Sequence, residues 1–311
     1  RALEAATNRQ ILHQCGALSI GPADFEAMRT TRDVVERYEL PHEMLTADEL
    51  HSRFPQFSPD ANDVGILDTR GGVLRPEVAV TAAHTAAEEH GAQLFFKTRV
   101  TELRSTADGV EVDTSAGTFH ASKVIVAAGS WTAQLLPQLR PYVEVRRIGL
   151  TWAMPRHIEQ FRPDVFPVFM RDRVAPDGSV THWFGAPSLD GYSIKIGVYP
   201  EPWNTVLSPG ARPANYTAEQ LAHVGEMIAQ CVPDVIAFPV RHSAHHDSFA
   251  SNQIPIFDRL ATDPRISYAT GMHGNAFKFA PSYGKMLAEM AVHGESSLWR
   301  DEFSLAAHEE L

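Results

Sequence analysis

Hydrophobic and polar positions along the chain follow two different spacings, which predicts a mixture of helices and strands. Apolar residues recur at helical spacing in four segments. These are residues 24–38, 45–55, 74–92 and 217–232. Thr46 and Glu49 have the spacing of a capping box at the start of the second segment. Pro76 suits the first turn of the third segment, and Gly91 stands where its C-terminal cap belongs.

Short apolar runs bounded by turn residues predict strands. Such runs lie at 16–22, 92–96, 124–127 and 266–271. Residues 98–121 predict a β-meander of three short strands, with turns at Gly109 and Gly117. The run 124–127 predicts a buried strand that ends beside Gly129, and a glycine there often marks a close approach of the backbone to something else. A glycine-rich turn after 266–271 leads into a predicted helix over 281–293.

Residues 143–200 change in character, because longer aromatic-rich segments with strand spacing follow one another there. They predict a mostly antiparallel sheet. A proline-rich connection over 200–213 separates this sheet from the last helices. Helix-to-strand steps together with such a sheet predict a mixed α/β fold, and the length suggests about two domains.

The composition is that of an ordinary globular protein, with 44% hydrophobic and 21% charged residues among 311. The net charge of −11 and the lack of a basic run argue against nucleic acid as a partner. No apolar stretch approaches the ~18 residues of a membrane span, so no membrane is expected. The two cysteines, Cys15 and Cys231, lie far apart, which favours a reducing, cytoplasmic location.

Three segments carry a resemblance to a known family. They are "KVIVAAGSWTAQLL" (123–136), "FGAPSLDGYSIKIG" (184–197) and "GMHGNAFKF" (271–279). In order and spacing they resemble the monomeric sarcosine oxidase and N-methyltryptophan oxidase family, within the D-amino-acid-oxidase-like flavoproteins. The resemblance extends from about residue 10 to 295.

The resemblance implies an FAD-binding Rossmann-like domain with an inserted β-meander, and a substrate domain with a mostly antiparallel sheet. The FAD-binding domain is expected to comprise residues 1–15, 64–142 and 250–311, and the substrate domain 16–63 and 143–249. The implied activity is oxidation of an N-alkyl amino acid or related small amine to an imine, with O2 reduced to hydrogen peroxide. The exact amine and the oligomeric state stay open.

Two departures from the family pattern bear on the cofactor. The opening strand, Gly-x-Gly-x-x-Gly turn and helix, which hold the pyrophosphate, are expected to be missing from this sequence. Residues 1–16 favour helix with nothing before them to cap it. In addition, the stretch 241–258 has no cysteine where the sarcosine oxidase type attaches FAD. We therefore expect FAD to be bound non-covalently.

Two alternatives to an active enzyme follow from the expected missing start. The chain could be a truncated, non-catalytic fragment or a binding scaffold without flavin. It could also be an enzyme whose N-terminal part was cleaved, lost or supplied by a separate chain. A yellow protein with a flavin absorption band would support the enzyme, since that chromophore belongs to the cofactor.

Two lysines are the candidate catalytic residues. Lys195 lies between Ile194 and Ile196 in an alternating strand, so its side chain points away from both isoleucines. The resemblance places Lys195 over the flavin, where a fixed ammonium favours the charge that develops as O2 takes an electron. Lys278 follows a glycine-rich turn and is expected near a substrate carboxylate or the pyrimidine end of the flavin, whose electronics depend on nearby charge. A solvent-facing lysine and a plain strand-to-helix turn are the structural alternatives.

Further residues are assigned to the cofactor and the substrate. The expected cofactor contacts are Val100, Gly129, Ser130, Trp131, Gly271, Gly274, Asn275 and Lys278. Gly271 and Gly274 would let backbone N–H groups approach the ligand. The expected substrate pocket is formed by Phe184, Tyr199 and His273, with Trp183 adding to its aromatic wall. The structural alternatives are a core strand ended by Gly129 with Trp131 packed against it, a plain core position for Val100, and a structural role for His273.

The segment "HSAHHD" (242–247) is rich in possible metal ligands. Zinc sites need three or four ligands in tetrahedral geometry, and no second cluster completes such a set here. We expect no metal, and we expect a surface loop or a loop beside the flavin at this segment.

Overall fold

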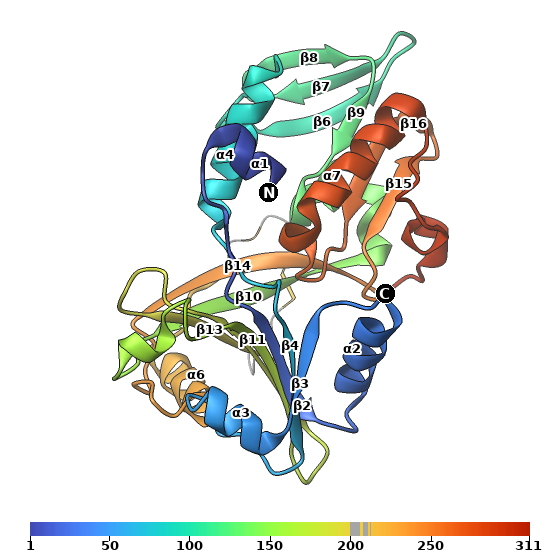
Figure 1. The fold of residues 1–311 in the computed structure, drawn as a ribbon. Coiled ribbons are helices and arrows are strands. Elements are labelled where there is room, and N and C mark those ends of the chain that lie inside the picture. The colour runs from blue at the N-terminus through green and yellow to red at the C-terminus, as the bar shows by residue number, and fades with distance from the viewer. Residues whose placement is uncertain (200–205, 208–210, 212) are drawn as a thin grey trace. The chain divides into compact units, whose positions relative to one another are not determined.

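The computed structural model describes residues 1–199, 206–207, 211 and 213–311, so most of the predicted proline-rich connection lies outside the described residues. Contacts divide the chain into two compact units (Figure 1). The first unit comprises Arg1–Ala92, Gly149–Trp203 and Ala214–Ala244. The second comprises Gln93–Ile148, Asn204–Pro213 and His245–Leu311.

An eight-stranded sheet organises the first unit. Its strands, in spatial order, are β14 (Arg241–Ala250), β10 (Val143–Ala153), β13 (Ile194–Tyr199), β12 (Val180–Ala186), β11 (Val168–Val174), β2 (Ala17–Pro22), β4 (Asp63–Asp68) and β3 (His42–Leu45). The pairing of β11 with β2 is parallel. The strand β13 pairs antiparallel with β10 and β12, and β12 pairs antiparallel with β11. The strand β4 pairs antiparallel with β2 and β3. The prediction of a mostly antiparallel sheet is confirmed.

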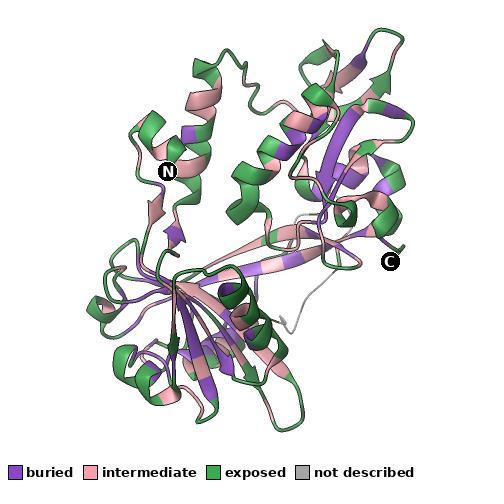
Figure 2. Ribbon diagram, turned by 45° about the vertical axis from the view of Figure 1, so that its right-hand side comes forward, coloured by how far each residue is buried: buried purple, intermediate pink, exposed green. Residues whose placement is uncertain are grey.

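Helices cover this sheet with apolar faces. The helices α3 (Ala47–Arg53) and α6 (Ala218–Cys231) contribute Leu50 and Ile228 to a core that also holds Phe169 and Trp183. Both helices begin with a capping box, and the one predicted at Thr46 is confirmed. On the other face, α2 (Glu26–Arg37) packs against the sheet. Figure 2 shows the buried residues concentrated on the strands, with outward helix faces exposed.

The rest of the first unit holds the predicted alanine-rich helix. This helix, α4 (Pro76–Glu89), has Pro76 at its start, and Gly91 follows it with φ of 87°. The segment 1–16 was expected to favour helix, but α1 (Ala2–Thr7) ends where Asn8 takes a left-handed conformation. Two short strands then pair antiparallel, β1 (Leu12–His13) with β5 (Val73–Leu74).

The strand predicted at 92–96 is wrong. No ladder pairs these residues with another strand in the described part of the chain, and Phe95 and Phe96 are exposed. A strand needs a neighbour to satisfy its backbone groups. The apolar run therefore forms an irregular connection, and the ring of Phe95 packs against Phe119 instead.

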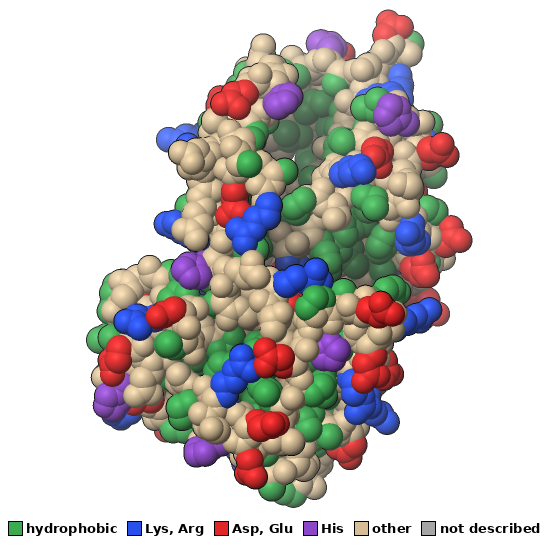
Figure 3. Space-filling model, viewed as in Figure 1, with side chains coloured by type: hydrophobic (Ala, Val, Ile, Leu, Met, Phe, Trp, Pro, Cys, Tyr) green, Lys and Arg blue, Asp and Glu red, His purple; other side chains and the backbone are tan. Residues whose placement is uncertain are grey.

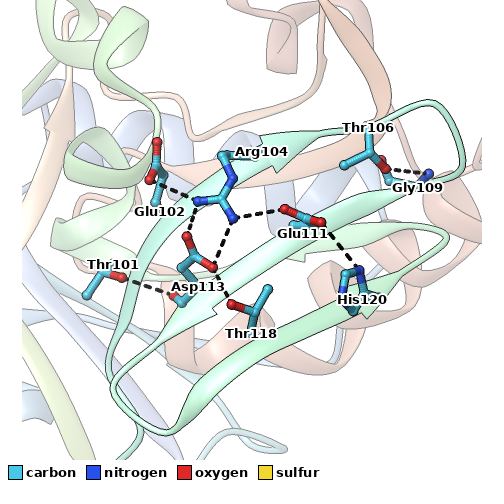
Figure 4. Close-up of polar contacts among 9 residues, drawn as sticks. All are labelled: Thr101, Glu102, Arg104, Thr106, Gly109, Glu111, Asp113, Thr118 and His120. Carbon is cyan, nitrogen blue, oxygen red and sulfur yellow. Dashed lines mark hydrogen bonds and ion pairs between the residues drawn. The ribbon is translucent and has the colours of Figure 1, made fainter.

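The second unit contains the predicted meander. Its strands are β6 (Val100–Ser105), β7 (Val110–Thr114) and β8 (Gly117–Ala121), paired antiparallel in sequence order. On one face, Arg104 forms ion pairs with Glu102, Glu111 and Asp113 (Figure 4). A hydrogen bond from Thr118 and the ion pair with Arg104 lower the pKa of Asp113. The pairs are solvent-exposed and contribute little to stability.

A second three-stranded sheet lies in this unit, in the order β15 (Ile256–Leu260), β16 (Asp263–Thr270) and β9 (Val124–Val126). The strand β16 pairs antiparallel with β15 and parallel with β9. Short helices follow β9, namely Gly129–Trp131, α5 (Thr132–Leu135) and Pro137–Tyr142. The prediction of a buried strand over 124–127 is confirmed for Val126 but wrong for Ile125, which is 41% exposed at the edge of the described sheet, and for Ala127, which is also exposed.

The helix after the glycine-rich turn is longer than predicted. It is α7 (Ala276–His293), and it places Met286, Leu287 and Met290 against the sheet residues Phe257 and Ala269. The predicted start at 281 is wrong, since Pro281 lies inside the helix. The described residues also form 3-10 helices at Ile158–Phe161, Asp301–Phe303 and Leu305–Ala307.

The two units do not coincide with the predicted domains. Residues 1–15 and 64–92 belong to the first unit, whereas the resemblance assigned them to the FAD-binding domain. Compactness within this chain does not by itself define which residues bind a cofactor, so the domain assignment stays a prediction.

No helix among the described residues is long and apolar enough to cross a membrane. Acidic and basic side chains are interspersed on the face drawn in Figure 3.

Candidate functional site

The alternation of β13 places Lys195 as the sequence predicts. Ile194 and Ile196 are fully buried in the core of the first unit, and Lys195 points to the opposite face of the sheet. Its side chain is largely buried, which lowers the pKa of its ammonium, while Glu77 acts in the opposite direction. Among the described residues, no hydrogen bond or ion pair joins Lys195 Nζ to a partner. A poorly hydrated ammonium without a partner is available to a bound ligand.

Phe184 and Tyr199 share this face with Lys195. Register places Phe184 directly opposite Gly197 and Ala186 opposite Lys195. A Cβ on Gly197 would come within 2.3 Å of the Phe184 ring, so the ring lies across the glycine. Tyr199 is 43% exposed at the end of β13. We call Lys195, Phe184 and Tyr199 the first-unit cluster.

Trp183 does not belong to this cluster, contrary to the expectation of an aromatic wall. It is 1% exposed, and its indole N–H donates to the carbonyl oxygen of Met227 at 3.0 Å. Neighbouring residues of a strand face opposite sides, so Phe184 and Trp183 cannot both line one pocket.

In the second unit, the glycine-rich turn is tied to β14. Gly271 and Gly274 have φ of 68° and 72°, a conformation that favours glycine. The N–H of Gly271 donates to the hydroxyl of Ser248 at 3.0 Å, and the N–H of Gly274 donates to Asp247 Oδ2 at 2.6 Å. The expectation that these two amides turn toward a ligand therefore differs from the structure, in which side chains of β14 already accept both.

Lys278 lies in the first turn of α7 rather than in the turn before it. Its Nζ donates to Asn275 Oδ1 at 3.0 Å, and both residues belong to the start of this helix. Asn275 provides no side-chain cap, so the first N–H groups of α7 remain available for an acceptor. A free helix start with an exposed lysine suits a carboxylate or another anionic group.

Histidine nitrogens without partners lie near this turn. The ring of His273 packs edge-on against Phe249 at 4.7 Å, and burial lowers the pKa of the imidazole. The ring of His246 lies 4.4 Å from that of Trp131. Both Nδ1 atoms are buried without a hydrogen-bond partner among the described residues. Buried polar atoms are normally satisfied, so these two point to a polar group that is not part of the chain.

Val100 and Trp131 line one hollow of about 460 Å³, together with Arg99, Ala128, Gln134 and Leu135. Gly129, next to this hollow in sequence, has φ of 53° and open space where a side chain would begin. Ser130 is buried beside it. The structure therefore brings together Val100 and the segment 129–131, which lie far apart in the sequence.

These features fit a flavin nucleotide. The hollow beside Trp131 offers an apolar wall for a planar ring, and the start of α7 offers donors for an acceptor. The unpaired Nδ1 atoms of His246 and His273 offer further polar contacts. Val100, Gly129, Ser130, Trp131, Asn275 and Lys278 are the residues of the second unit that would hold it; we call them the second-unit cluster.

A larger hollow of about 650 Å³ lies elsewhere in the first unit. Asp60, Arg173 and Gln230 line it, and Trp183 closes one side. Trp183 was predicted for the substrate pocket, but Lys195, Phe184 and Tyr199 do not line this hollow.

The segment 242–247 proves to be part of the strand β14, not a loop. In a strand, successive side chains point to opposite faces, so neighbouring histidines do not converge on one ion. No group of three or more metal-ligating side chains occurs among the described residues.

Sequence reasoning missed the role of Asp247 and Ser248 in holding the turn. Strand alternation within "HSAHHDSFA" was the available signal for it.

The chain belongs to the family of FAD dependent oxidoreductases, which it matches over residues 1–290. A monomeric sarcosine oxidase from Streptomyces avermitilis is 27% identical over 297 residues, covering 95% of this chain and 76% of the relative. An N-methyl-L-tryptophan oxidase from Yersinia pestis is 28% identical over 306 residues, covering 98% and 80%. The resemblance inferred from three short segments is thereby confirmed, and FAD is the cofactor of this family.

Solved structures agree on the fold. NikD, an unusual amino acid oxidase essential for nikkomycin biosynthesis, aligns with a TM-score of 0.79 at 24% identity. The alignment covers 98% of this chain and 79% of the NikD chain. The predicted fold class is confirmed by this likeness.

Proposed function

We propose that this protein is an FAD-dependent amine oxidase that acts on an N-alkyl amino acid or a related small amine. The two relatives described above are named for such substrates, sarcosine and N-methyl-L-tryptophan. Bound FAD would supply the electron-accepting chemistry, the amine would leave as an imine, and O2 would be reduced to hydrogen peroxide. The observation that carries the proposal is the largely buried, unpaired ammonium of Lys195, which shares a sheet face with the half-buried ring of Phe184 and the exposed ring of Tyr199.

Each cluster has its own part in the proposal. The ammonium of Lys195 stabilises the negative charge that develops when O2 accepts an electron. Phe184 and Tyr199 provide apolar surface for the substrate, and His273 provides a polar contact. Lys278 and the start of α7 attract a carboxylate or the pyrimidine end of the flavin.

The cofactor contacts in the proposal follow from the second unit. Val100, Gly129, Ser130 and Trp131 hold the adenine and ribose side of FAD, and the turn from Gly271 through Gly274 to Asn275 supports the ring side. The amides of both turn glycines are engaged by β14, so we propose that they shape the turn and that α7 supplies the donors. We further propose that FAD is bound non-covalently and that the enzyme works in the cytoplasm.

Reduction under anaerobic conditions tests the proposal directly. FAD-loaded protein is mixed with sarcosine or N-methyltryptophan, and bleaching of the visible flavin band is followed. We expect bleaching, and on admission of O2 we expect recovery of the band with one hydrogen peroxide per amine oxidised. A yellow protein that no secondary amine bleaches would overturn the proposed reaction. A protein that takes up no FAD would favour the non-catalytic scaffold instead.

A further inference from the structure

A histidine–carboxylate pair lies on the same sheet face as the first-unit cluster. Asp172 on β11 is directly opposite His182 on β12, and His182 is directly opposite Tyr199 on β13. The Nδ1 atom of His182 lies 2.7 Å from Asp172 Oδ1. Together these three side chains form a row across three strands. We call it the distal row.

The distal row is separated from Lys195 by a defined stretch of sheet. Tyr199 and Lys195 are four residues apart on β13, which is about 13 Å at the rise of a strand. Between them lies the intermediate row of Met170, Phe184 and Gly197. Met170 is 49% exposed, and the Phe184 ring lies across Gly197. The face therefore runs from an ammonium, across apolar surface, to the histidine–carboxylate pair.

The two ends of this face have opposite charge. Lys195 is directly opposite Trp152 on β10, and the guanidinium carbon of Arg241 lies 3.9 Å from the centre of the Trp152 ring. Two cations thus mark the Lys195 end. At the other end, Asp172 supplies a carboxylate, and a His182 tautomer with its proton on Nδ1 donates that proton to Asp172 and leaves Nε2 as an acceptor.

We propose that the distal row binds an ammonium group at the far end of the substrate. This inference rests on the proposed amine oxidation and names its substrate class: N-alkyl diamino acids or diamines whose two nitrogens are joined by several methylenes. His182 Nε2 accepts a hydrogen bond from the distal ammonium, Asp172 supplies the countercharge and orients the ring, and the Tyr199 ring attracts the cation. The methylenes pass over Phe184 and Met170. His182 is a specificity-determining residue, and Asp172 is its positioning residue.

Three probes with the same six-carbon backbone test the proposal. They are α-N-methyl-lysine, α-N-methyl-norleucine and N-methyl-2-aminoadipate, which end in an ammonium, a methyl and a carboxylate. A hydrogen bond to a charged group contributes about 1.5–3 kcal/mol, so kcat/KM should favour the lysine derivative over the norleucine derivative by about 10- to 100-fold. The difference should lie mainly in KM. The aminoadipate derivative should be the poorest of the three.

Variants assign the preference to the distal row. Asp172→Asn and His182→Gln should each reduce the preference for the lysine derivative over the norleucine derivative to within about threefold. Asp234→Asn is the matched control, because His157 and Asp234 form a second pair with 2.8 Å between Nδ1 and Oδ1 at a different place in the first unit. That control should keep the full preference. Melting temperatures show whether each variant folds. If Asp172→Asn does not fold, His182→Gln alone tests the preference.

Direct binding separates this inference from the proposed reaction. The chemically reduced, FAD-loaded protein cannot oxidise the probes, so calorimetric titration reports their affinities alone. Tighter binding of the lysine derivative that is lost in both distal-row variants supports the inference even if no probe is oxidised. Equal affinities for the lysine and norleucine derivatives, a preference for the aminoadipate derivative, or an unchanged preference in both variants would overturn it. Failure of the three probes, and of sarcosine and N-methyltryptophan, to bleach the flavin would overturn only the proposed reaction.

Discussion

The carboxylate of Asp247 accepts a hydrogen bond from the backbone N–H of Gly274, with 2.6 Å between Oδ2 and the nitrogen. The two residues are 27 positions apart in the sequence, and the bond ties the glycine-rich turn before α7 to the strand β14. The turn precedes the helix start that we propose to attract a negatively charged group. Its geometry therefore depends on a side chain from a different element.

Asp247→Ala should loosen this turn. The variant leaves the Gly274 N–H without its acceptor, and water replaces that acceptor only in part, so we expect a loss of about 1 kcal/mol in the free energy of unfolding. Urea unfolding measures the loss, and titration with FAD measures the accompanying decrease in affinity. Asp247→Asn keeps an acceptor oxygen and should recover most of both quantities. If the asparagine variant is as impaired as the alanine variant, the charge of Asp247 matters and the hydrogen bond does not.

The two turn glycines should differ in their tolerance of alanine. Gly271 and Gly274 both have positive φ, which costs alanine about 1–2 kcal/mol. At Gly271 the added Cβ would also come within 2.9 Å of the Ala250 side chain, whereas the space around Gly274 is open. Gly271→Ala should therefore destabilise the protein by at least about 1 kcal/mol more than Gly274→Ala. Gly178→Ala, at a turn with φ of 83° and open space, is the control, and it should match Gly274→Ala in urea unfolding.

Lys195→Met should separate the two halves of the proposed reaction. Removing one preorganised electrostatic group typically costs on the order of 10²–10³ in rate. We expect the reaction of the reduced enzyme with O2 to slow by this factor, with much less effect on its reduction by the amine. Stopped-flow absorbance measures both rates, and Lys285→Met on α7 serves as the control. Equal effects on both rates, or none, would return Lys195 to a structural role.

The same variant should be more stable than the parent protein at neutral pH. Burial lowers the pKa of Lys195, so folding disfavours its charged form. The resulting loss in the free energy of unfolding is fully present below the pKa that Lys195 has in the folded protein. It shrinks as the pH rises toward the unfolded-state pKa of about 10.4, and it is absent above that pH. Lys195→Met should therefore raise the melting temperature at pH 7, and the gain should shrink as the pH approaches 10. A gain that does not change with pH would arise from packing rather than from charge.

Local patterns in the sequence were enough to predict much of the fold and part of the site. The capping box at Thr46 and Glu49 involves residues three positions apart, so neighbouring residues alone determine it. The position of Lys195 on the sheet face opposite to Ile194 and Ile196 follows from the period of two in a strand. Resemblance in three short segments then identified the family.

Features that depend on distant partners could not be predicted in the same way. The segment 242–247 has few residues that favour strands, and it becomes a strand through its tertiary surroundings. The start of α7 was misplaced because Pro281 is typical of a first helical turn, whereas the helix includes it five residues after Ala276. The pairing of Asp172 with His182 requires the register of β11 against β12, and no spacing in the sequence reveals that register.

Acid precipitation of the FAD-loaded protein should release all of its flavin into the supernatant. Covalent attachment to a cysteine requires a reactive thiolate, and neither thiol of this chain favours that form. Cys231 is fully buried, which raises its pKa to about 12, and burial also raises the pKa of Cys15. The stretch 241–258 contains no cysteine at all. Flavin absorbance is compared between supernatant and redissolved pellet, with Cys15→Ser as a control that should behave like the parent. Flavin that stays with the pellet in both proteins would show a covalent bond to a side chain other than Cys15, and non-covalent binding would then be wrong.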